Sequence, residues 1–546
     1  MSTQGFKGSF RQSMAWFHTW IGLVLSVLLY FIFITGSFGY FRTEVNHWMQ
    51  PEQKLHSAEV PSHSEMAEAG FAYLAQAAPE ATRFFIAFPT QRHPALYYYA
   101  ALPEENEKGD KFVRGDLDPS TGQPLQARET GGGDALYAMH YSLHYMPYRV
   151  AIYIVGVATM FMFIALITGI VIHKKIFVDF FTLRLGKGQR SWLDGHNISS
   201  VLALPFLLMI TYSGLVFYTF DYMPGVAALS MGVEDATEQI GAHLYPDYEP
   251  VEPSGEQASM ASVGDVMTQA QQVWPAESIR YVNLENRGDR VALFHVGQHS
   301  QGLSRGSGVM KFNAITGEML DRPEHRLGAD VVFTRGALAL HEGHFANIHL
   351  RWLYFLSGLI GAAMVATGMI LWAKKRRTRL GKKGVAGNGL KFVERTNLAI
   401  IVGLPLGVGA YFWANRLLPL GLEGRPEWEM HCLFLVWLAS FFHAGFRELG
   451  QAWREQLAAL GATFALLPVV DALTTNAHLI ASLREGDWVR AGFDIAVLMF
   501  AGAVFIVLRN MTPSLESALG SDAREHSSAV AGGGARAASV PQAPAD

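Results

Sequence analysis

Cysteine is nearly absent from this sequence. Cys432 is the single cysteine among 546 residues, so no disulfide can form within the chain. Iron–sulfur clusters and thiolate zinc sites are excluded with it, which leaves histidine, methionine and carboxylate as metal ligands. The sequence also lacks a G-x-G-x-x-G fingerprint, a P-loop and an H-E-x-x-H zinc motif. It therefore gives no sign of a nucleotide-binding domain.

Charged residues are few as well, at 16% against 50% hydrophobic residues, and the mean hydropathy is positive. This balance is typical of a polytopic α-helical membrane protein, because the charges must be separated from long apolar runs. A run of roughly 18 residues crosses a hydrocarbon core of about 30 Å. Such runs lie near 15–41, 150–172, 198–220, 350–372, 398–418, 430–446, 457–480 and 488–508.

Lysine and arginine are distributed unevenly between these runs. They gather between the second and third runs and again after the fourth, at Lys174, Lys175, Arg184, Lys187, Arg190, Lys374, Lys375, Arg376, Arg377, Arg379, Lys382 and Lys383. The positive-inside rule makes these segments cytoplasmic, which puts both termini inside and residues 42–148 and 221–348 outside. The first run has no small-residue cleavage site behind it, so we expect it to be retained.

The first two thirds of the sequence reads as two tandem copies of one unit, 1–180 and 190–380. Each copy has an apolar run, a small α/β outer segment and a second apolar run. The turn Ser120-Thr-Gly-Gln-Pro-Leu125 matches Ile315-Thr-Gly-Glu-Met-Leu320. Helices are predicted near 60–78 and 256–273, and strands at 83–88, 96–101, 278–284 and 291–296. Parallel copies imply a pseudo-twofold axis along the membrane normal and a four-helix bundle.

These patterns divide the chain into seven parts. They are an N-terminal lead and first span, a first outer domain, two spans with their loop, a second outer domain, a fourth span with a basic loop, a C-terminal four-helix appendage and a disordered tail. Their predicted limits are 1–41, 42–148, 149–220, 221–348, 349–394, 395–510 and 511–546.

Histidines at the ends of the spans fall into two layers. The cytoplasmic layer contains His18, His173 and His196, and the outer layer contains His140, His144, His341, His344 and His349. A single interfacial histidine is commonly a headgroup contact. Two layers of imidazole in a four-helix bundle, however, are what bis-histidine ligation of two haems requires, since ligands approach a flat macrocycle from both sides.

Two six-coordinate haems need four imidazoles, so some of the candidates are spare. For the outer haem we predict His144 or His140 with His341, and His344 is the next choice. For the inner haem we predict His196 with His173, and His18 is the repeat-related competitor.

Two further groups of residues bear on this hypothesis. Arg149 and Arg351 lie at outer ends of spans and would either pair with haem propionates or act as snorkelling anchors. Small Ser/Thr-Gly pairs interrupt four spans and favour close approach of a neighbouring helix or a macrocycle; they are Thr35-Gly36, Thr168-Gly169, Ser213-Gly214 and Thr367-Gly368.

Several motifs within 10–380 resemble the PepSY-associated transmembrane helix proteins of bacterial inner membranes. They are Leu143-His144-Tyr145, His173-Lys-Lys-Ile-Phe-Val-Asp-Phe-Phe-Thr-Leu-Arg184, Trp192-Leu-Asp-Gly-His196, Leu340-His341-Glu-Gly-His-Phe345 and Leu350-Arg-Trp-Leu-Tyr-Phe355. The outer Thr-Gly turns resemble the PepSY domain itself.

The resemblance implies an inner-membrane haem b oxidoreductase with two periplasmic PepSY-like domains. Such a protein would reduce a ferric siderophore or another ferric chelate in the periplasm and release iron. Since no nucleotide-binding motif is present, its electrons would come from a membrane quinol or a cytoplasmic reductase. Nucleic acid is not an expected partner.

Two other functions remain open from the sequence. In the first, the PepSY pair is a periplasmic sensor or protease-regulating module, and the helices only anchor it. In the second, the C-terminal spans form a transport path. The sensor hypothesis gives no purpose to the inner histidine layer.

Overall fold

The computed structural model describes most of the chain, and every structural statement here refers to this part: residues 10–53, 61–104, 111–173, 175–184, 187–219, 251–298, 308–321, 328–380 and 387–511. Eight helices within it are long and apolar enough to cross a membrane, which confirms the predicted multi-pass membrane protein. The predicted tail beyond residue 511 lies outside the described residues.

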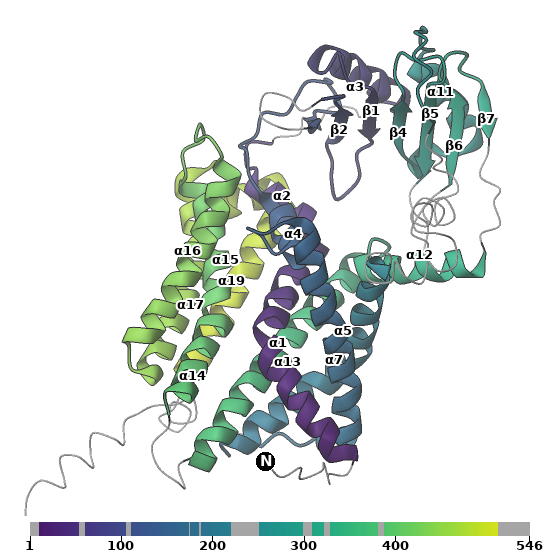
Figure 1. Cartoon of the computed structure of the whole chain (residues 1–546). Helices are drawn as coiled ribbons and strands as arrows, with labels where there is room; N and C mark the ends of the chain where they lie inside the picture. Colours follow the sequence, from purple (N-terminus) through teal and green to yellow (C-terminus); the bar gives the residue numbers. More distant parts are fainter. Residues whose placement is uncertain are drawn as a thin grey trace, which may run out of the picture.

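Four long helices form a bundle. They are α1 (Phe10–Phe38), α5 (Tyr148–Ile172), α7 (Gln189–Phe217) and α13 (Ile348–Leu380). Helix α1 packs against α5 and α13, and α7 packs against the same two neighbours, so the four enclose a common centre (Figure 1). Helices suit these apolar segments because every backbone polar group is satisfied within the segment, as a bilayer core requires.

One antiparallel sheet lies beyond one end of the bundle (Figure 1). Its strands follow the order β3-β2-β1-β4-β5-β6-β7. Their bounds are β1 Arg83–Ala87, β2 Leu96–Ala101, β3 Phe112–Leu117, β4 Ile279–Glu285, β5 Leu293–Gln298, β6 Val309–Asn313 and β7 Met319–Asp321. Strands β1, β2, β4 and β5 lie where the sequence predicts them.

The sheet corrects one expectation. The sequence predicts two separate α/β units, but β1 of the first pairs with β4 of the second, with Phe84 opposite Leu284 and Ile86 opposite Val282. Helices α3 (His63–Ala77) and α11 (Val263–Val273) pack on each other and share one core with the strands. If the two units were separate, β1 and β4 would each be an edge strand with unpaired N–H and C=O groups. Pairing β1 with β4 satisfies the backbone groups of both edges.

Short helices connect the sheet to the bundle. They are η1 (Gly39–Phe41), α2 (Arg42–Met49), α4 (Gly132–Ser142) and α12 (Ala329–Glu342), while η2 (Ala276–Ser278) lies between α11 and β4 and α6 (Ile176–Asp179) lies at the other end. Helix α12 runs across the end of the bundle below the sheet (Figure 1). We call this end the sheet side, and the opposite end, where Lys375 and Arg376 lie, the basic side.

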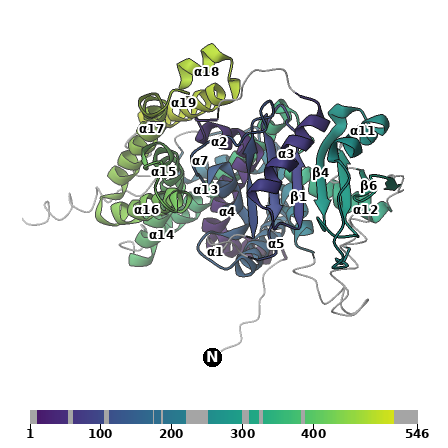
Figure 2. The same cartoon turned by 90° about the horizontal axis from the view of Figure 1, so that it is seen from above.

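The remaining helices form a C-terminal unit beside the bundle (Figure 2). They are α14 (Asn388–Ile401), α15 (Gly403–Leu417), α16 (Arg425–Phe446), α17 (Leu449–Thr474), α18 (Leu479–Glu485) and α19 (Trp488–Arg509). Tyr30 of α1 donates a hydrogen bond to the Ile401 carbonyl over 2.9 Å, and Phe31 stacks on Trp437. Contacts of this kind attach the unit to α1.

Candidate functional site

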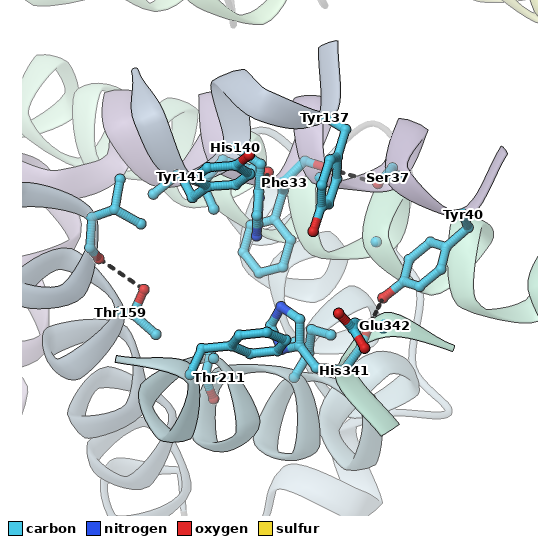
Figure 3. Close-up of a pocket in the computed structure, with 18 of the residues that line it drawn as sticks. Phe33, Ser37, Tyr40, Tyr137, His140, Tyr141, Thr159, Thr211, His341 and Glu342 are labelled. Atoms are coloured by element: carbon cyan, nitrogen blue, oxygen red, sulfur yellow. Dashed lines mark hydrogen bonds between the residues drawn. The ribbon is translucent and has the colours of Figure 1, made fainter. Parts of the chain in front are cut away.

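A cavity of about 160 Å³ lies at the sheet side of the bundle. His140, in the last turn of α4, and His341, in the last turn of α12, face each other across it (Figure 3). Their ring centroids are 6.2 Å apart, and a ring nitrogen of each points into the cavity. Residues of α1, α5 and α7 complete the wall.

Hydrogen bonds orient both rings of this sheet-side pair. The Nδ1 of His140 lies 2.9 Å from the Ile32 carbonyl oxygen, to which it can only donate. The Nδ1 of His341 lies 3.0 Å from the Ser213 hydroxyl and also bonds the Ile210 carbonyl. A proton held on Nδ1 leaves the lone pair on Nε2, the arrangement that metal-binding histidines show.

Burial keeps both imidazoles neutral. It lowers the pKa of His140 below its ordinary value of 6.5 and lowers that of His341 to about 3, where the nearby His140 adds to the effect. Taking a charged imidazolium out of water is unfavourable, so the neutral form dominates at physiological pH. A neutral ring is the form that can act as a ligand.

A second pair occupies the basic side. His18 of α1 and His196 of α7 have ring centroids 6.4 Å apart and line a larger cavity, of about 460 Å³. The Nδ1 of His18 lies 3.0 Å from the Ala165 carbonyl, and the Nδ1 of His196 lies 2.9 Å from the Met364 carbonyl. The Nε2 atoms are again the free ligand positions.

The four Ser/Thr-Gly pairs are where these histidines pack. In each case the carbonyl that accepts from Nδ1 belongs to the residue three before the serine or threonine, and the glycine lies against the ring. The sets are Ile32, Thr35, Gly36 with His140; Ala165, Thr168, Gly169 with His18; Ile210, Ser213, Gly214 with His341; and Met364, Thr367, Gly368 with His196.

Close approach to the rings favours glycine at these positions, most strongly at Gly36. A Cβ at position 36 would lie 2.3 Å from the His140 Nδ1. At Gly214 and Gly368 it would lie 3.1 and 3.2 Å from the facing ring, and at Gly169 it would lie 3.4 Å away. The sequence predicts room for a helix or a macrocycle here, and the structure shows that the space is taken by an imidazole.

Four of the eight predicted histidines do not join either pair, and one of them, His349, is exposed. His144 stacks on Phe434 of the C-terminal unit, with ring centroids 5.6 Å apart. His173 lines the basic-side cavity, where Asn197 lies 3.3 Å from its Nε2, but it is not the residue opposite His196. His344 is at the rim of the sheet-side cavity, with 54% of its side chain exposed.

The two predicted arginines differ in their surroundings. Arg149 is exposed. Arg351 is 7% exposed and pairs with Glu44, which also accepts hydrogen bonds from Arg92 of the loop between β1 and β2. Arg351 therefore belongs to an ionic network that joins the sheet to the bundle.

Sequence reasoning missed the groups that orient the rings. The Ile32, Ala165, Ile210 and Met364 carbonyls carry no side-chain signal, but the Ser/Thr-Gly pairs three residues later mark them. His18 precedes Gly36 by the same eighteen positions that separate His196 from Gly214. That matched spacing was the available signal for pairing His18 with His196.

Each candidate metal site contains two facing imidazoles. Among the described residues, no cluster of three or more His, Cys, Asp or Glu side chains could hold a metal ion. Two facing neutral imidazoles can instead supply both axial ligands of a metal whose other positions are filled by a planar chelator.

Comparison with known families gives one match. The family model described as PepSY-associated TM region matches residues 15–375, which contain the bundle, the sheet and all four paired histidines. No curated protein matches the chain. The C-terminal unit lies beyond the matched residues.

Proposed function

Because this chain belongs to the family with a PepSY-associated TM region, we propose that it is a haem b oxidoreductase of a bacterial inner membrane. It would bind two haems and reduce a ferric chelate, such as a ferric siderophore, in the periplasm. One observation carries this proposal: two pairs of facing histidines lie in the bundle, one near each end. They are His140 with His341 and His18 with His196.

The spacing of the rings supports haem as the ligand. Imidazole nitrogen binds a transition metal at about 2 Å, so a metal between two Nε2 atoms separates the ring centroids by about 6 Å. The observed separations are 6.2 and 6.4 Å. Both pairs therefore fit a bis-histidine site.

The protein orients the histidine rings and excludes water from the bundle. The carbonyls of Ile32 and Met364 fix the tautomers of His140 and His196, which increases ligand basicity. Apolar residues such as Leu29 and Met162, which line both cavities, exclude water from the space between the two sites. Bound haem b would supply reversible one-electron transfer in this position.

The orientation of the protein in the membrane follows from the distribution of charge. Basic residues cluster at the end of the bundle opposite the sheet, and the positive-inside rule makes that end cytoplasmic. The sheet and the His140–His341 pair would then lie at the periplasmic side. Tyr137, Arg42 and His344 line the sheet-side cavity, where a ferric chelate would approach.

Reduction would release iron because of the chemistry of the substrate. Fe(III) in a siderophore is held by hard oxygen donors, and one-electron reduction gives Fe(II), which these donors hold less tightly. The protein needs only to deliver the electron, since the lower affinity then frees the metal.

An absorption spectrum of the purified full chain tests the proposal. We expect a Soret band, bis-histidine features after dithionite reduction and two haems per chain. His341→Ala should lower the ratio to about one, whereas the exposed neighbour His344 should tolerate alanine with two haems retained. Absence of a Soret band after expression with ample haem would refute the haem proposal.

A second assay separates an oxidoreductase from a sensor. Anaerobically reduced protein is mixed with a ferric siderophore and a colorimetric Fe(II) chelator. Reoxidation of the haem together with stoichiometric Fe(II) capture is expected. A fully haem-loaded protein that is not reoxidised would exclude the reductase activity and favour the sensing hypothesis.

A further inference from the structure

The two histidine cavities differ in size although their ring separations are nearly equal. The sheet-side cavity has about 160 Å³ and the basic-side cavity about 460 Å³. The basic-side cavity therefore offers more space than its counterpart for the same pair of imidazoles.

The additional wall comes from outside the four-helix bundle. Helix α14 of the C-terminal unit packs against α13 and α1, and it contributes Phe392, Val393, Thr396 and Asn397 to the lining. Trp372 lies on the same side, near the end of α13. One wall of the site thus belongs to the part of the chain that the family match does not cover.

This wall combines apolar surface with a few polar groups. Asn397 is 5% exposed and donates its Nδ2 to the Met369 carbonyl over 3.2 Å. Within the described residues its Oδ1 has no hydrogen-bond partner, so it is available as an acceptor. Thr396 adds a hydroxyl one residue away, and the side chain of Phe392 is exposed at the edge of the cavity.

We infer that this part of the cavity, between α13 and α14, binds the head group of a membrane quinol that serves as the electron donor. The inference rests on the proposed haem function and names the donor for its basic-side site. A quinol suits the lining because its hydroxyls need an acceptor such as the Asn397 Oδ1, while its ring and isoprenoid tail are apolar. No nucleotide-binding motif in the sequence supplies another donor site.

Oxidation of one quinol breaks both O–H bonds and yields a quinone, two protons and two electrons. A haem held by His18 and His196 would accept the electrons one at a time, and the protons would pass to solvent at the basic side near the exposed Lys375. Two ferric chelates are reduced to Fe(II) for each quinol oxidised.

The test uses the full chain in lipid nanodiscs and two variants of α14. Thr396→Trp fills the cavity, and Asn397→Leu replaces the amide, with both its acceptor and its donor to Met369, by an apolar side chain with the same number of heavy atoms. Arg395→Trp is the matched control, because Arg395 is the neighbouring residue but does not line the cavity. An azido-ubiquinone photoprobe, mapped by peptide mass spectrometry, reports binding; anaerobic haem reduction by decylubiquinol reports transfer.

We expect the photoprobe to label the α14 peptide in the wild type. Labelling and the rate of reduction by decylubiquinol should each fall at least tenfold in Thr396→Trp and several-fold in Asn397→Leu, with Arg395→Trp unchanged. Haem content and reduction by dithionite should be equal in all four proteins, which shows that the variants fold.

Two results would overturn the inference. One is a photoprobe result that does not depend on the cavity: the probe labels peptides outside α13 and α14, or it labels Thr396→Trp and the wild type equally. The other is a haem-loaded wild type that dithionite reduces and decylubiquinol does not, which would leave the haem proposal standing and point to a cytoplasmic protein donor. A wild type without haem would instead refute the proposed function, and the photoprobe would still report whether the cavity binds a quinone.

Discussion

Gly36 of α1 lies against the ring of His140 so closely that a Cβ at this position would be 2.3 Å from the imidazole Nδ1. The glycine and the histidine are 104 positions apart in the sequence and come from different helices. On the other side of the cavity the approach is looser, since a Cβ at Gly214 would lie 3.1 Å from the His341 ring. The position of each imidazole is thus set by the absence of a side chain on its neighbour.

Alanine at position 36 should therefore displace His140 and prevent binding of the haem proposed for the sheet-side cavity. We expect the haem-to-protein ratio of Gly36→Ala to fall from two to about one, measured by pyridine haemochrome. Gly502→Ala in α19 is the control, because no atom lies within 4 Å of a Cβ there and this residue lines neither histidine cavity. That variant should keep both haems, and equal haem content in the two variants would contradict the packing argument.

The choice of ligand on the basic side can be tested directly. His18→Ala should remove the haem proposed between His18 and His196, since His18 is the residue facing the His196 ring. His173→Ala should retain two haems, because His173 hydrogen-bonds Asn197 at the cavity wall instead. Haem quantification and the low-spin spectrum distinguish the two; loss of haem in His173→Ala alone would restore the pairing favoured by the sequence.

The ionic network at Glu44 should stabilise the junction of sheet and bundle. Glu44→Gln leaves the buried Arg351 guanidinium without its carboxylate partner, and breaking a buried pair in this way costs about 3–5 kcal/mol. Glu256→Gln is the control, because the Arg290–Glu256 pair is 71% and 64% exposed and is worth at most about 1 kcal/mol. Chemical unfolding in detergent measures both; similar losses would show that the Glu44 network is not specially stabilising.

The sheet should lose stability in mild acid because of His295. Burial lowers the pKa of this histidine to about 4, despite Glu285, with Lys311 and Arg83 adding to the effect. A folded pKa below the unfolded value of about 6.5 means that stability is full above pH 6.5 and falls as the pH drops towards 4. The shift corresponds to about 3 kcal/mol across that window.

Hydrogen exchange of β4 and β5 at pH 7 and pH 4.5 measures this loss. We expect faster exchange at the lower pH in the wild type. The change should be much smaller in His295→Gln, which cannot take up a proton. An equal acid response in the two proteins would show that other groups control it.

The sequence alone determined the membrane class, the eight spans and the two layers of histidine. Each of these depends on local composition or on spacing along one helix: apolar runs of sufficient length, and imidazoles such as His18 and His341 near the ends of those runs. The strands near Phe84 and Val282 also followed from local pattern. Such features need no knowledge of which segments become neighbours.

Only the tertiary structure decided which residues meet. The choice of His18 over His173 depends on helix orientation and on the Ala165 carbonyl, which has no side-chain identity to read. The joining of two outer units into one sheet depends on edge pairing between β1 and β4. The contribution of α14 to the basic-side cavity depends on how the C-terminal unit packs. These are contacts between distant segments, and their physical cause is the packing of complementary surfaces rather than any local pattern.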